Sequence, residues 1–531
     1  MSLLQFASAA VLLVALYSEA TSYLRRQRMP PGPPGIPILG NAMQLPTTMA
    51  WFRLTEWKEK YGPIYSLNLA GQPVVVLNTH KTAADLLDRR SHIYSDRPRL
   101  IMAGEILTGG IYMVFVRYGA LWRRMRRASH DSFNLRSVEK YQPALFTESA
   151  LNILDITDDP NSWEDCLVNT AASNILAAVY GRTRITRTDK SLLTRIHGHT
   201  ARLASATAPG AFLVELFPFM LHFPRWLAKW KRDGIAWHEE ETRFLERLSQ
   251  EAMETDVGHM MRQLAESEQR HGLSEKEMAW LAGIMLGAGS ETTSGSLLSF
   301  VLAMVLHPEV VRKAQAEIDA VVGRDRLPSY EDKEKLPYVR AILKETLRWR
   351  PVGPLAVPRR VTEDDWYEGY FIPKGTMVLP NVWAMNRLDR IHCSSVSRLA
   401  HGFNLTRDPE VFPDFDEFRP ERFLDETGKV DHTPPDTHSM GHVTFGFGRR
   451  ICAGYNFANH VLFIQMAMLL WAFHFDKALQ ADGQPVIPSK DDFIDAGVVV
   501  FPAPFKCKIT PRFEGLRSVI QREIENLGIE M

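Results

Sequence analysis

One cysteine, Cys452, lies in a glycine-rich stretch directly before an apolar run of helical period at residues 457–470. Glycines permit a tight turn there, and both the N–H groups of a helix start and the neighbouring Arg449 and Arg450 favour an ionised sulfur. A single thiolate can be an axial ligand of haem iron, whereas a lone cysteine is more often a buried structural residue. Taken by itself, Cys452 favours the structural interpretation.

An acid stands beside a hydroxyl in the middle of a long apolar pattern at residues 278–306, whose centre reads Gly287-Ala288-Gly289-Ser290-Glu291-Thr292-Thr293. A buried acid is costly unless it has partners or a role. A membrane span is the alternative, but it would place the acid in lipid, so we expect a buried core helix that lines a cavity. Glu291 and Thr292 could move protons there. The competing interpretation of Thr292 is a hydroxyl bonded back to its own helix.

Two further pairs have the spacing of neighbours on a helix face. Glu345 and Arg348 are three residues apart, and Trp122 and Arg126 are four apart. An exposed Glu–Arg pair of this kind contributes only ~0.3–0.5 kcal/mol to stability. A buried pair would instead lose about 3–5 kcal/mol when one partner is removed.

The composition excludes several classes of protein. The chain has 531 residues, of which 45% are hydrophobic, so it can bury a large core. Lys and Arg total 62 and Asp and Glu total 62, which gives no basic excess for a bulk nucleic-acid binder. Four cysteines exclude a disulfide-rich secreted scaffold.

The amino terminus predicts a membrane anchor at residues 1–24, where an apolar run is followed at once by Arg25, Arg26 and Arg28. Twenty-four helical residues reach far enough to cross the hydrocarbon core, and the positive-inside rule leaves the body cytosolic. A cleaved signal peptide is the alternative, although the run lacks a positive leader. Residues 25–40 hold five prolines within eight positions, which predicts a stiff, basic, non-helical hinge.

The body, residues 41–531, reads as mainly α with a small β portion. Residues 67–77 have β character around a turn at Gly71 and Pro73, and helical periodicity dominates residues 118–347. No repeat or clear linker follows, so we expect a single large domain behind the anchor.

Four motifs in order resemble the cytochrome P-450 superfamily of haem-thiolate monooxygenases, most closely its fungal microsomal members. They are Phe445-Gly446-Phe447-Gly448-Arg449-Arg450-Ile451-Cys452-Ala453-Gly454, Ala288-Gly289-Ser290-Glu291-Thr292, Glu345-Thr346-Leu347-Arg348, and Phe418-Arg419-Pro420-Glu421-Arg422-Phe423. The resemblance extends from the anchor to about residue 512. It implies the cytochrome P-450 fold.

The resemblance also implies a role for each site residue. Cys452 would bind the iron of haem b (iron protoporphyrin IX), and Glu291 with Thr292 would deliver protons. Trp122, Arg126, Arg359 and Arg450 would hold the haem, with Arg360 as a substitute for Arg359. Glu345 and Arg348 would form a buried network with Arg422. Substrate contacts would fall in residues 101–116, beside Gly287 and Ala288, and in 352–357 and 497–499.

The implied enzyme inserts one oxygen atom from O2 into an apolar small molecule, with a terpenoid or other secondary metabolite as the leading class. Broad oxidation of aromatic or polycyclic compounds is the second hypothesis, and an oxygen-independent isomerase or a haem carrier is less favoured. The implied partners are NADPH–cytochrome P-450 reductase and, as a further candidate, cytochrome b5, at the endoplasmic reticulum membrane. Arg123, Arg124 and Arg127 form either a solvated face or a docking patch for such an acidic donor.

One stretch departs from the family. Residues 388–407 separate Asn386-Arg387 from Asp408-Pro409, and deleting them restores a familiar Asn-Arg-Asp-Pro run. The twenty residues correspond to an in-frame segment, so we expect a retained intron. The alternative is a genuine surface loop.

Overall fold

The computed structural model describes residues 27–182, 184–185, 191–208, 210–255, 257–387, 412, 414–430 and 433–528. The expected anchor at 1–24 and the insertion at 388–407 therefore lie outside the described residues. The elements are mostly helices with four small sheets, which confirms the predicted fold class. The chain divides into two compact units, each assembled from separate segments. The first holds Met1–Pro98, Pro354–Pro413 and Gly446–Ile451, and the second holds Arg99–Gly353, Asp414–Phe445 and Cys452–Met531.

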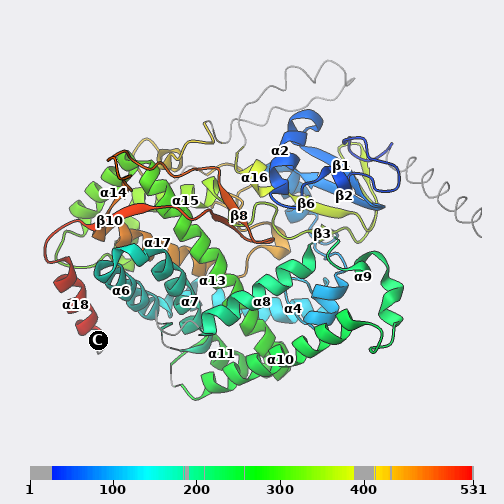
Figure 1. Cartoon of the computed structure of the whole chain (residues 1–531), viewed down its shortest axis with the longest axis horizontal. Helices are drawn as coiled ribbons and strands as arrows, with labels where there is room; N and C mark the ends of the chain where they lie inside the picture. Colours follow the sequence, from blue (N-terminus) through cyan, green and yellow to red (C-terminus); the bar gives the residue numbers. More distant parts are fainter. Residues whose placement is uncertain are drawn as a thin grey trace, which may run out of the picture. The chain divides into compact units, whose positions relative to one another are not determined.

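The second unit contains most of the helices (Figure 1). In its first half these are η3 (Ile101–Leu107), α4 (Ala120–Phe133), α5 (Leu135–Glu139), α6 (Gln142–Asp158), η4 (Pro160–Ser162), α7 (Trp163–Tyr180), α8 (Ser191–Thr207), α9 (Leu213–Leu216), η5 (Pro218–His222), α10 (Lys229–Met253), α11 (Met260–Glu266) and α12 (Glu268–His271). There follow α13 (Glu275–Leu306), α14 (Pro308–Val321), η6 (Tyr330–Lys335), α15 (Pro337–Trp349), η7 (Pro420–Phe423), α17 (Tyr455–Ala472) and α18 (Leu516–Asn526). Two short antiparallel strand pairs complete it, β7 (Phe473–Lys477) with β10 (Cys507–Pro511) and β8 (Phe493–Asp495) with β9 (Val500–Pro502).

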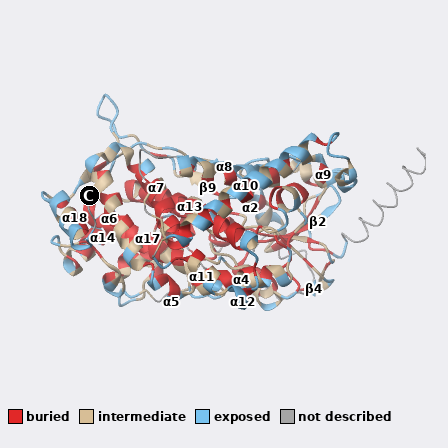
Figure 2. Cartoon of the chain, turned by 90° about the horizontal axis from the view of Figure 1, so that it is seen from below, coloured by how far each residue is buried: buried red, intermediate tan, exposed pale blue. Residues whose placement is uncertain are grey.

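The axis of the second unit is the 32-residue helix α13. Ser274 begins it with a capping box, in which its hydroxyl accepts the N–H of Glu277 while the Glu277 carboxylate accepts the N–H of Ser274. Pro308, the first residue of α14, cannot continue the α13 ladder. Figure 2 shows α13, α7 and α17 largely in the colour of buried residues. The predicted buried core helix is therefore confirmed.

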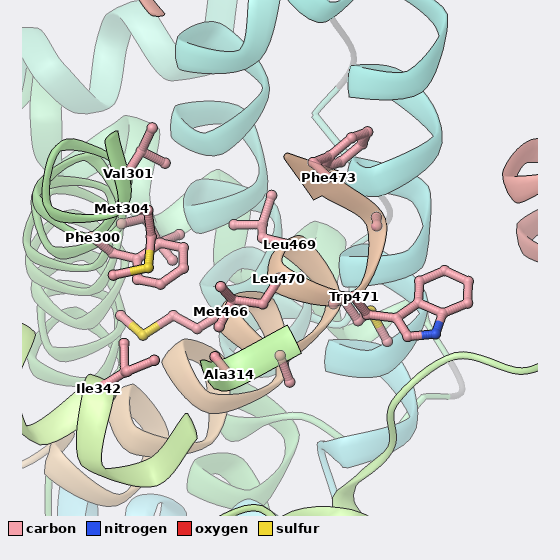
Figure 3. Close-up of a cluster of buried hydrophobic side chains, with 14 of the residues drawn as sticks. Phe300, Val301, Met304, Ala314, Ile342, Met466, Leu469, Leu470, Trp471 and Phe473 are labelled. Carbon is pink, nitrogen blue, oxygen red and sulfur yellow. The ribbon is translucent and has the colours of Figure 1, made fainter. Parts of the chain in front are cut away.

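A cluster of apolar side chains fixes the carboxyl half of α13 (Figure 3). Phe300, Val301 and Met304 of α13 face side chains of α17, among them Met466 and Leu469. Fully burying one such side chain contributes about 1.5–3 kcal/mol, so this layer holds α13 rigidly against α17. A rigid helix keeps the side chains of its middle turns in place.

The first unit is built on a sheet of order β1-β2-β6-β3. β1 and β2 form the hairpin expected near residues 67–77, although Pro73 lies inside β2 rather than in the turn. β2 pairs with β6 in parallel, and β3 pairs with β6 antiparallel. The elements of this unit are η1 (Ala42–Gln44), α2 (Ala50–Tyr61), β1 (Ile64–Leu69), β2 (Gln72–Leu77), α3 (His80–Ala83), η2 (Ala84–Arg89), β3 (Arg359–Arg360), β4 (Asp365–Tyr367), β5 (Tyr370–Ile372), β6 (Met377–Pro380), α16 (Val382–Met385) and η8 (Gly448–Arg450).

The proline-rich stretch is non-helical, as its composition predicts, but it is also tied to this sheet. The N–H and hydroxyl of Ser66 on β1 donate to the carbonyls of Pro31 and Pro30 at 2.9 and 2.6 Å. The N–H of Asn41 donates to the Asn68 carbonyl at 2.6 Å. From Pro30 onward the segment is thus part of the folded body.

Among the described residues no single helix is both long and apolar enough to cross a bilayer. α13 and α14 satisfy that test only when taken together, and they are bent by 104° at the break between them.

Candidate active site

One face of α13, called here the uncovered face, is more exposed than the rest of the helix, although Gly289 on it packs against Ile175 of α7. Between Met278 and Val305 almost every residue is buried, and Ala288 is the one residue in the exposed class. The less buried residues recur at the spacing i, i+3, i+4 and i+7, which is a single helix face: Met285, Ala288, Gly289 and Thr292. Glu291 flanks this face and is itself partly buried. A rigid helix thus presents small and apolar groups, one hydroxyl and one acid on the same side.

The Thr292 hydroxyl donates to the carbonyl oxygen of Ala288 at 2.7 Å. This is the back-bonded arrangement considered for a helix threonine. A hydroxyl has one proton but two acceptor lone pairs, so Thr292 can still accept a hydrogen bond on the uncovered face. Back-bonding and a role in proton handling are therefore compatible.

Burial raises the pKa of Glu291 to about 7, and the nearby Thr200 side chain lowers it in part. At neutral pH the carboxyl is then divided between its protonated and ionised forms. A general acid or base works best when its pKa lies near the working pH. Glu291 has the electrostatic property that a proton relay needs.

Cys452 stands three residues before α17 begins at Tyr455, as the apolar run predicts. Its N–H donates to the carbonyl of Phe445 at 2.9 Å. The side chain is accessible to solvent, yet enough protein surrounds it that desolvation raises the pKa of the thiol. Among the described residues, the backbone N–H of Gly454 and the charge of Arg126 oppose that rise. The Gly454 N–H lies at the start of α17, as predicted, and Arg126 adds a charge that the sequence did not point to; a contribution from Arg449 and Arg450 stays a prediction.

Arg126 and Trp122 come from one face of α4 (Ala120–Phe133). Trp122 is buried and lies against the Tyr118 ring, with ring centroids 5.2 Å apart. Burial lowers the pKa of Arg126, and the nearby Cys452 raises it in part. The predicted i, i+4 pair thus shares a face, and Arg126 lies close enough to Cys452 for their charges to interact.

Other arginines of α4 are engaged within the protein. Arg124 donates to the carbonyl of Gly272 and forms an ion pair with Glu277, with Nη2 and Oε1 3.4 Å apart. Arg127 donates to the carbonyl of Arg270 at 3.4 Å, and Arg123 lies over the Tyr118 ring. The sequence offered two roles for these arginines, a solvated face or a docking patch. Neither describes them fully, since Arg124 and Arg127 also bind the segment before α13.

In the first unit, β3 consists of Arg359 and Arg360, whose side chains alternate as in any strand. Arg359 is buried and donates to the Phe447 carbonyl at 2.5 Å. The Arg360 side chain reaches instead toward Gly375, 3.7 Å from where a Cβ would lie. Of the two arginines that the sequence offered as a haem contact, Arg359 is therefore the buried one.

Arg450 and a residue that sequence reasoning missed, Arg97, belong to the same unit. Arg450 Nε donates to the Ser95 carbonyl at 2.9 Å, and Arg97 Nη1 donates to the carbonyls of Val357 and Pro358 at 2.6 and 2.7 Å. Burial holds the pKa of Arg97 well below its usual range, and the neighbouring charges of Arg450 and Arg359 lower it further. Nothing in the sequence distinguishes Arg97 from the exposed arginines around it.

The predicted network around Glu345 is present in the second unit and is fully buried at its centre. Arg348 donates to both oxygens of Glu345, with Nε–Oε2 2.7 Å and Nη2–Oε1 2.8 Å. Arg422 Nε is 3.1 Å from Oε1, and the N–H of Arg419 donates to the same oxygen at 2.8 Å. Arg422 also donates to the carbonyls of Asp414 and Glu417, so one carboxylate fastens this segment to α15.

Comparison with known proteins identifies the family. The chain matches the family described as Cytochrome P450 over residues 30–392 and 399–509. It is 51% identical over 498 residues to cytochrome P450 monooxygenase 58 of Postia placenta, across 93% of this chain and 90% of that protein. A cytochrome P450 monooxygenase of Armillaria gallica is 44% identical over 524 residues, across 97% and 96%. The chain belongs to the cytochrome P450 family.

As a P450, the protein is a haem-thiolate monooxygenase, and its own residues fit that cofactor. Two buried arginines, Arg97 and Arg359, and the half-buried Arg450 gather in the first unit, and the Asp88 and Asp96 charges near them compensate only in part. Arg359 Nη1 is buried without a hydrogen-bond partner among the described residues. A buried cationic group of this kind calls for an anion, and the propionates of haem b are carboxylates. In the second unit, Cys452 is the residue that would supply the sulfur.

Proposed function

We propose that this P450 inserts one oxygen atom from O2 into an apolar small molecule. The leading substrate class is a terpenoid or other secondary metabolite. The uncovered face of α13 is the observation that carries the proposal, because it places a hydroxyl and a half-ionised acid beside small and apolar groups. A binding site of this composition suits an apolar substrate, with few polar groups to orient it.

Each predicted residue receives a role. Cys452 would bind the iron, and Trp122 and Arg126 of α4, which belong to the same unit as the cysteine, would contact the haem. Arg359 and Arg450 bind propionates, and Arg97 joins them. Bound haem supplies the iron at which dioxygen is reduced, and thiolate donation favours O–O cleavage. Metal coordination deprotonates a thiol outright, which offsets the effect of burial on Cys452.

Glu291 and Thr292 move protons in the proposed reaction. Thr292 accepts a hydrogen bond on the uncovered face, while its own hydroxyl proton remains hydrogen bonded to the Ala288 carbonyl. Glu291 gives up a proton toward that face and regains one from solvent, for which a pKa of about 7 is suited. An oxygen-independent isomerase would have no use for this pair.

The membrane and the electron donor complete the proposal. Residues 1–24 form a single-pass anchor, and 41–531 form the cytosolic domain at the endoplasmic reticulum. The basic, proline-rich segment 25–40 joins them, and from Pro30 onward it is tied to the sheet of the first unit. Exposed apolar side chains around α9 and η5 support contact with a membrane surface: Leu213, Leu216, Phe217, Phe219, Trp226 and Leu227. NADPH–cytochrome P450 reductase delivers the electrons, with cytochrome b5 as a second donor.

We also propose that residues 388–407 are an insertion that arises from a retained intron. The interruption of the family match at residues 393–398 supports this proposal, since it falls inside the same stretch. Transcript reads across the junction test it. Spliced reads that lack the 60 nucleotides as the major form support the intron, and reads that retain them as the major form contradict it.

The activity is tested in microsomes that contain the full chain and a fungal P450 reductase. A panel of sesquiterpenes, diterpenes and polycyclic aromatics is incubated with NADPH under 18O2. We expect a terpenoid product that carries one 18O atom. Turnover confined to the aromatics would replace the terpenoid assignment, and a product formed without O2 or NADPH would contradict the monooxygenase mechanism.

A further inference from the structure

Arg350, the residue that follows α15, places its guanidinium between two aromatic rings of the second unit. Its Cζ lies 4.0 Å from the centroid of the Phe493 ring and 4.9 Å from that of Trp349. Arg350 is buried, and its Nη1 and Nη2 atoms have no hydrogen-bond partner among the described residues. The quadrupole of an aromatic face attracts such a cation, more strongly where water is excluded. Contacts with the two rings therefore hold the end of this side chain.

The guanidinium remains a cation at neutral pH. Burial lowers the pKa of Arg350 to about 10, and the charges of Asp491, Asp416 and Asp492 oppose that change. A buried cation is costly unless its surroundings compensate for the lost water. The Phe493 ring, which comes from β8, therefore stabilises Arg350 and is in turn fixed by it.

The partner of β8, strand β9, lies against α13 (Figure 2). The N–H of Val500 on β9 donates to the Val352 carbonyl at 2.9 Å. A Cβ at Gly295 of α13 would stand 3.1 Å from the Val352 side chain and 3.2 Å from the Phe501 ring, so this glycine lets both approach closely. Gly295 follows Thr292 by three residues and continues the uncovered face. β9 therefore borders the carboxyl end of that face.

The turn between β8 and β9 reaches α8. The N–H of Gly497 donates to the Asp495 carboxylate at 2.8 Å, and a Cβ at Gly497 would stand 3.3 Å from the Cβ of Ala204 on α8. Thr200 shares that face of α8, and its Oγ1 lies 3.5 Å from where a Cβ of Gly287 would stand on α13. The uncovered face is thus bordered by α8 at its amino end and by β9 at its carboxyl end, and the two borders meet at the turn.

We propose that Arg350 is a positioning residue: by stacking on Phe493 it holds the strand pair β8–β9 beside the uncovered face of α13, and so sets the room that a substrate has there. The inference rests on the proposed substrate site on that face and deepens it. Phe493 attaches β8 to Arg350, and Val500 attaches β9 to Val352. Without the stack only the second attachment remains, and the turn can shift along α8. Bulky ligands, which fill the site up to its borders, should sense this shift, whereas small ligands should not.

Hydrogen–deuterium exchange of the haem-loaded full chain, read on peptides within residues 491–503, tests the attachment. Arg350→Met removes the charge, Phe493→Leu removes the ring, and Phe493→Tyr keeps it. We expect exchange to become about tenfold faster in Arg350→Met and in Phe493→Leu, but not in Phe493→Tyr. The double variant should exchange no faster than either single one, because both changes remove the same contact. Lys490→Met is the matched control, since Lys490 is a cation just before β8 whose side chain is 43% exposed, 3.6 Å from Oδ2 of Asp416.

Binding of two nitrogen ligands to the haem iron, followed by the Soret difference spectrum, tests the consequence for the site. Imidazole is small, whereas 1-tritylimidazole carries three phenyl rings. The Kd of 1-tritylimidazole should rise about tenfold in Arg350→Met and in Phe493→Leu. It should stay at the parent value in Phe493→Tyr and in Lys490→Met, and the Kd of imidazole should stay unchanged in all four variants.

Unchanged exchange in Arg350→Met, or an equal effect in Lys490→Met, overturns the proposal. Faster exchange with unchanged 1-tritylimidazole binding also overturns it, because Arg350 would then support the fold without shaping the site. Phe493→Leu decides the question if Arg350→Met does not fold. Ala288→Phe, which fills the uncovered face, separates this inference from the proposed function. Unchanged 1-tritylimidazole binding in Ala288→Phe would refute the substrate site itself, whereas its loss there without any effect of Arg350→Met would refute only the role of Arg350.

Discussion

Removing the charge of Glu345 should cost far more stability than removing an exposed glutamate with the same helical spacing to an arginine. In Glu345→Gln, Arg348 and Arg422 lose their shared carboxylate while their side chains remain 0% and 4% exposed. A buried ion pair that loses one partner costs about 3–5 kcal/mol, because the remaining charge stays desolvated. The matched control is Glu56→Gln, whose pair with Arg53 is also i, i+3 but has side chains 63% and 49% exposed.

Equilibrium urea unfolding, followed by circular dichroism, measures the free energy of unfolding of the two variants. Glu56→Gln should lose less than ~1 kcal/mol, as exposed pairs do. Glu345→Gln should also retain less haem at a given denaturant concentration, since the network fastens residues 414–423 to α15. A loss below about 1 kcal/mol in Glu345→Gln, equal to that of Glu56→Gln, would refute the argument that burial makes this network strong.

Three further predictions follow from the site. Because the folded state raises the pKa of Glu291 from 4.5 to about 7, its proton stabilises the fold fully below pH 4.5 and this contribution is lost as the pH rises through 7. Glu291→Gln should therefore gain up to about 3 kcal/mol over the parent in urea unfolding at pH 8, and almost nothing at pH 4.5; an equal gain at both pH values would contradict the raised pKa. Thr292→Ala should divert NADPH to peroxide several-fold more than Thr292→Ser, and equal coupling in the two would remove the hydroxyl from the mechanism. Arg359→Gln should weaken haem retention about tenfold to a hundredfold in a transfer assay with apomyoglobin, whereas Arg360→Gln should not; equal losses would mean that the buried side chain has no special role.

Local patterns in the sequence were sufficient to predict the parts of the site that lie on one helix. Glu345 with Arg348 and Trp122 with Arg126 follow from helical spacing alone, and α13 follows from its apolar run. These features depend on neighbours in the chain, which a sequence displays directly.

Groups that meet through tertiary packing were not predicted. Arg97 is an ordinary residue in sequence, and its importance arises from Arg359 and Arg450, which are far away along the chain. The choice between Arg359 and Arg360 likewise depends on which face of β3 turns inward. The thiol of Cys452 shows the same limit, since one favourable charge comes from Arg126 on α4, which is far away along the chain.

The central claim, that Cys452 is the thiolate ligand of haem, is tested most directly by the carbon monoxide difference spectrum of the reduced protein. The full chain should show the thiolate-type Soret shift, and so should Cys166→Ala, in which a buried cysteine of α7 is removed. Haem-loaded Cys452→Ser should lack the shift. A thiolate-type spectrum in Cys452→Ser, or its absence from the haem-loaded full chain, would contradict the account.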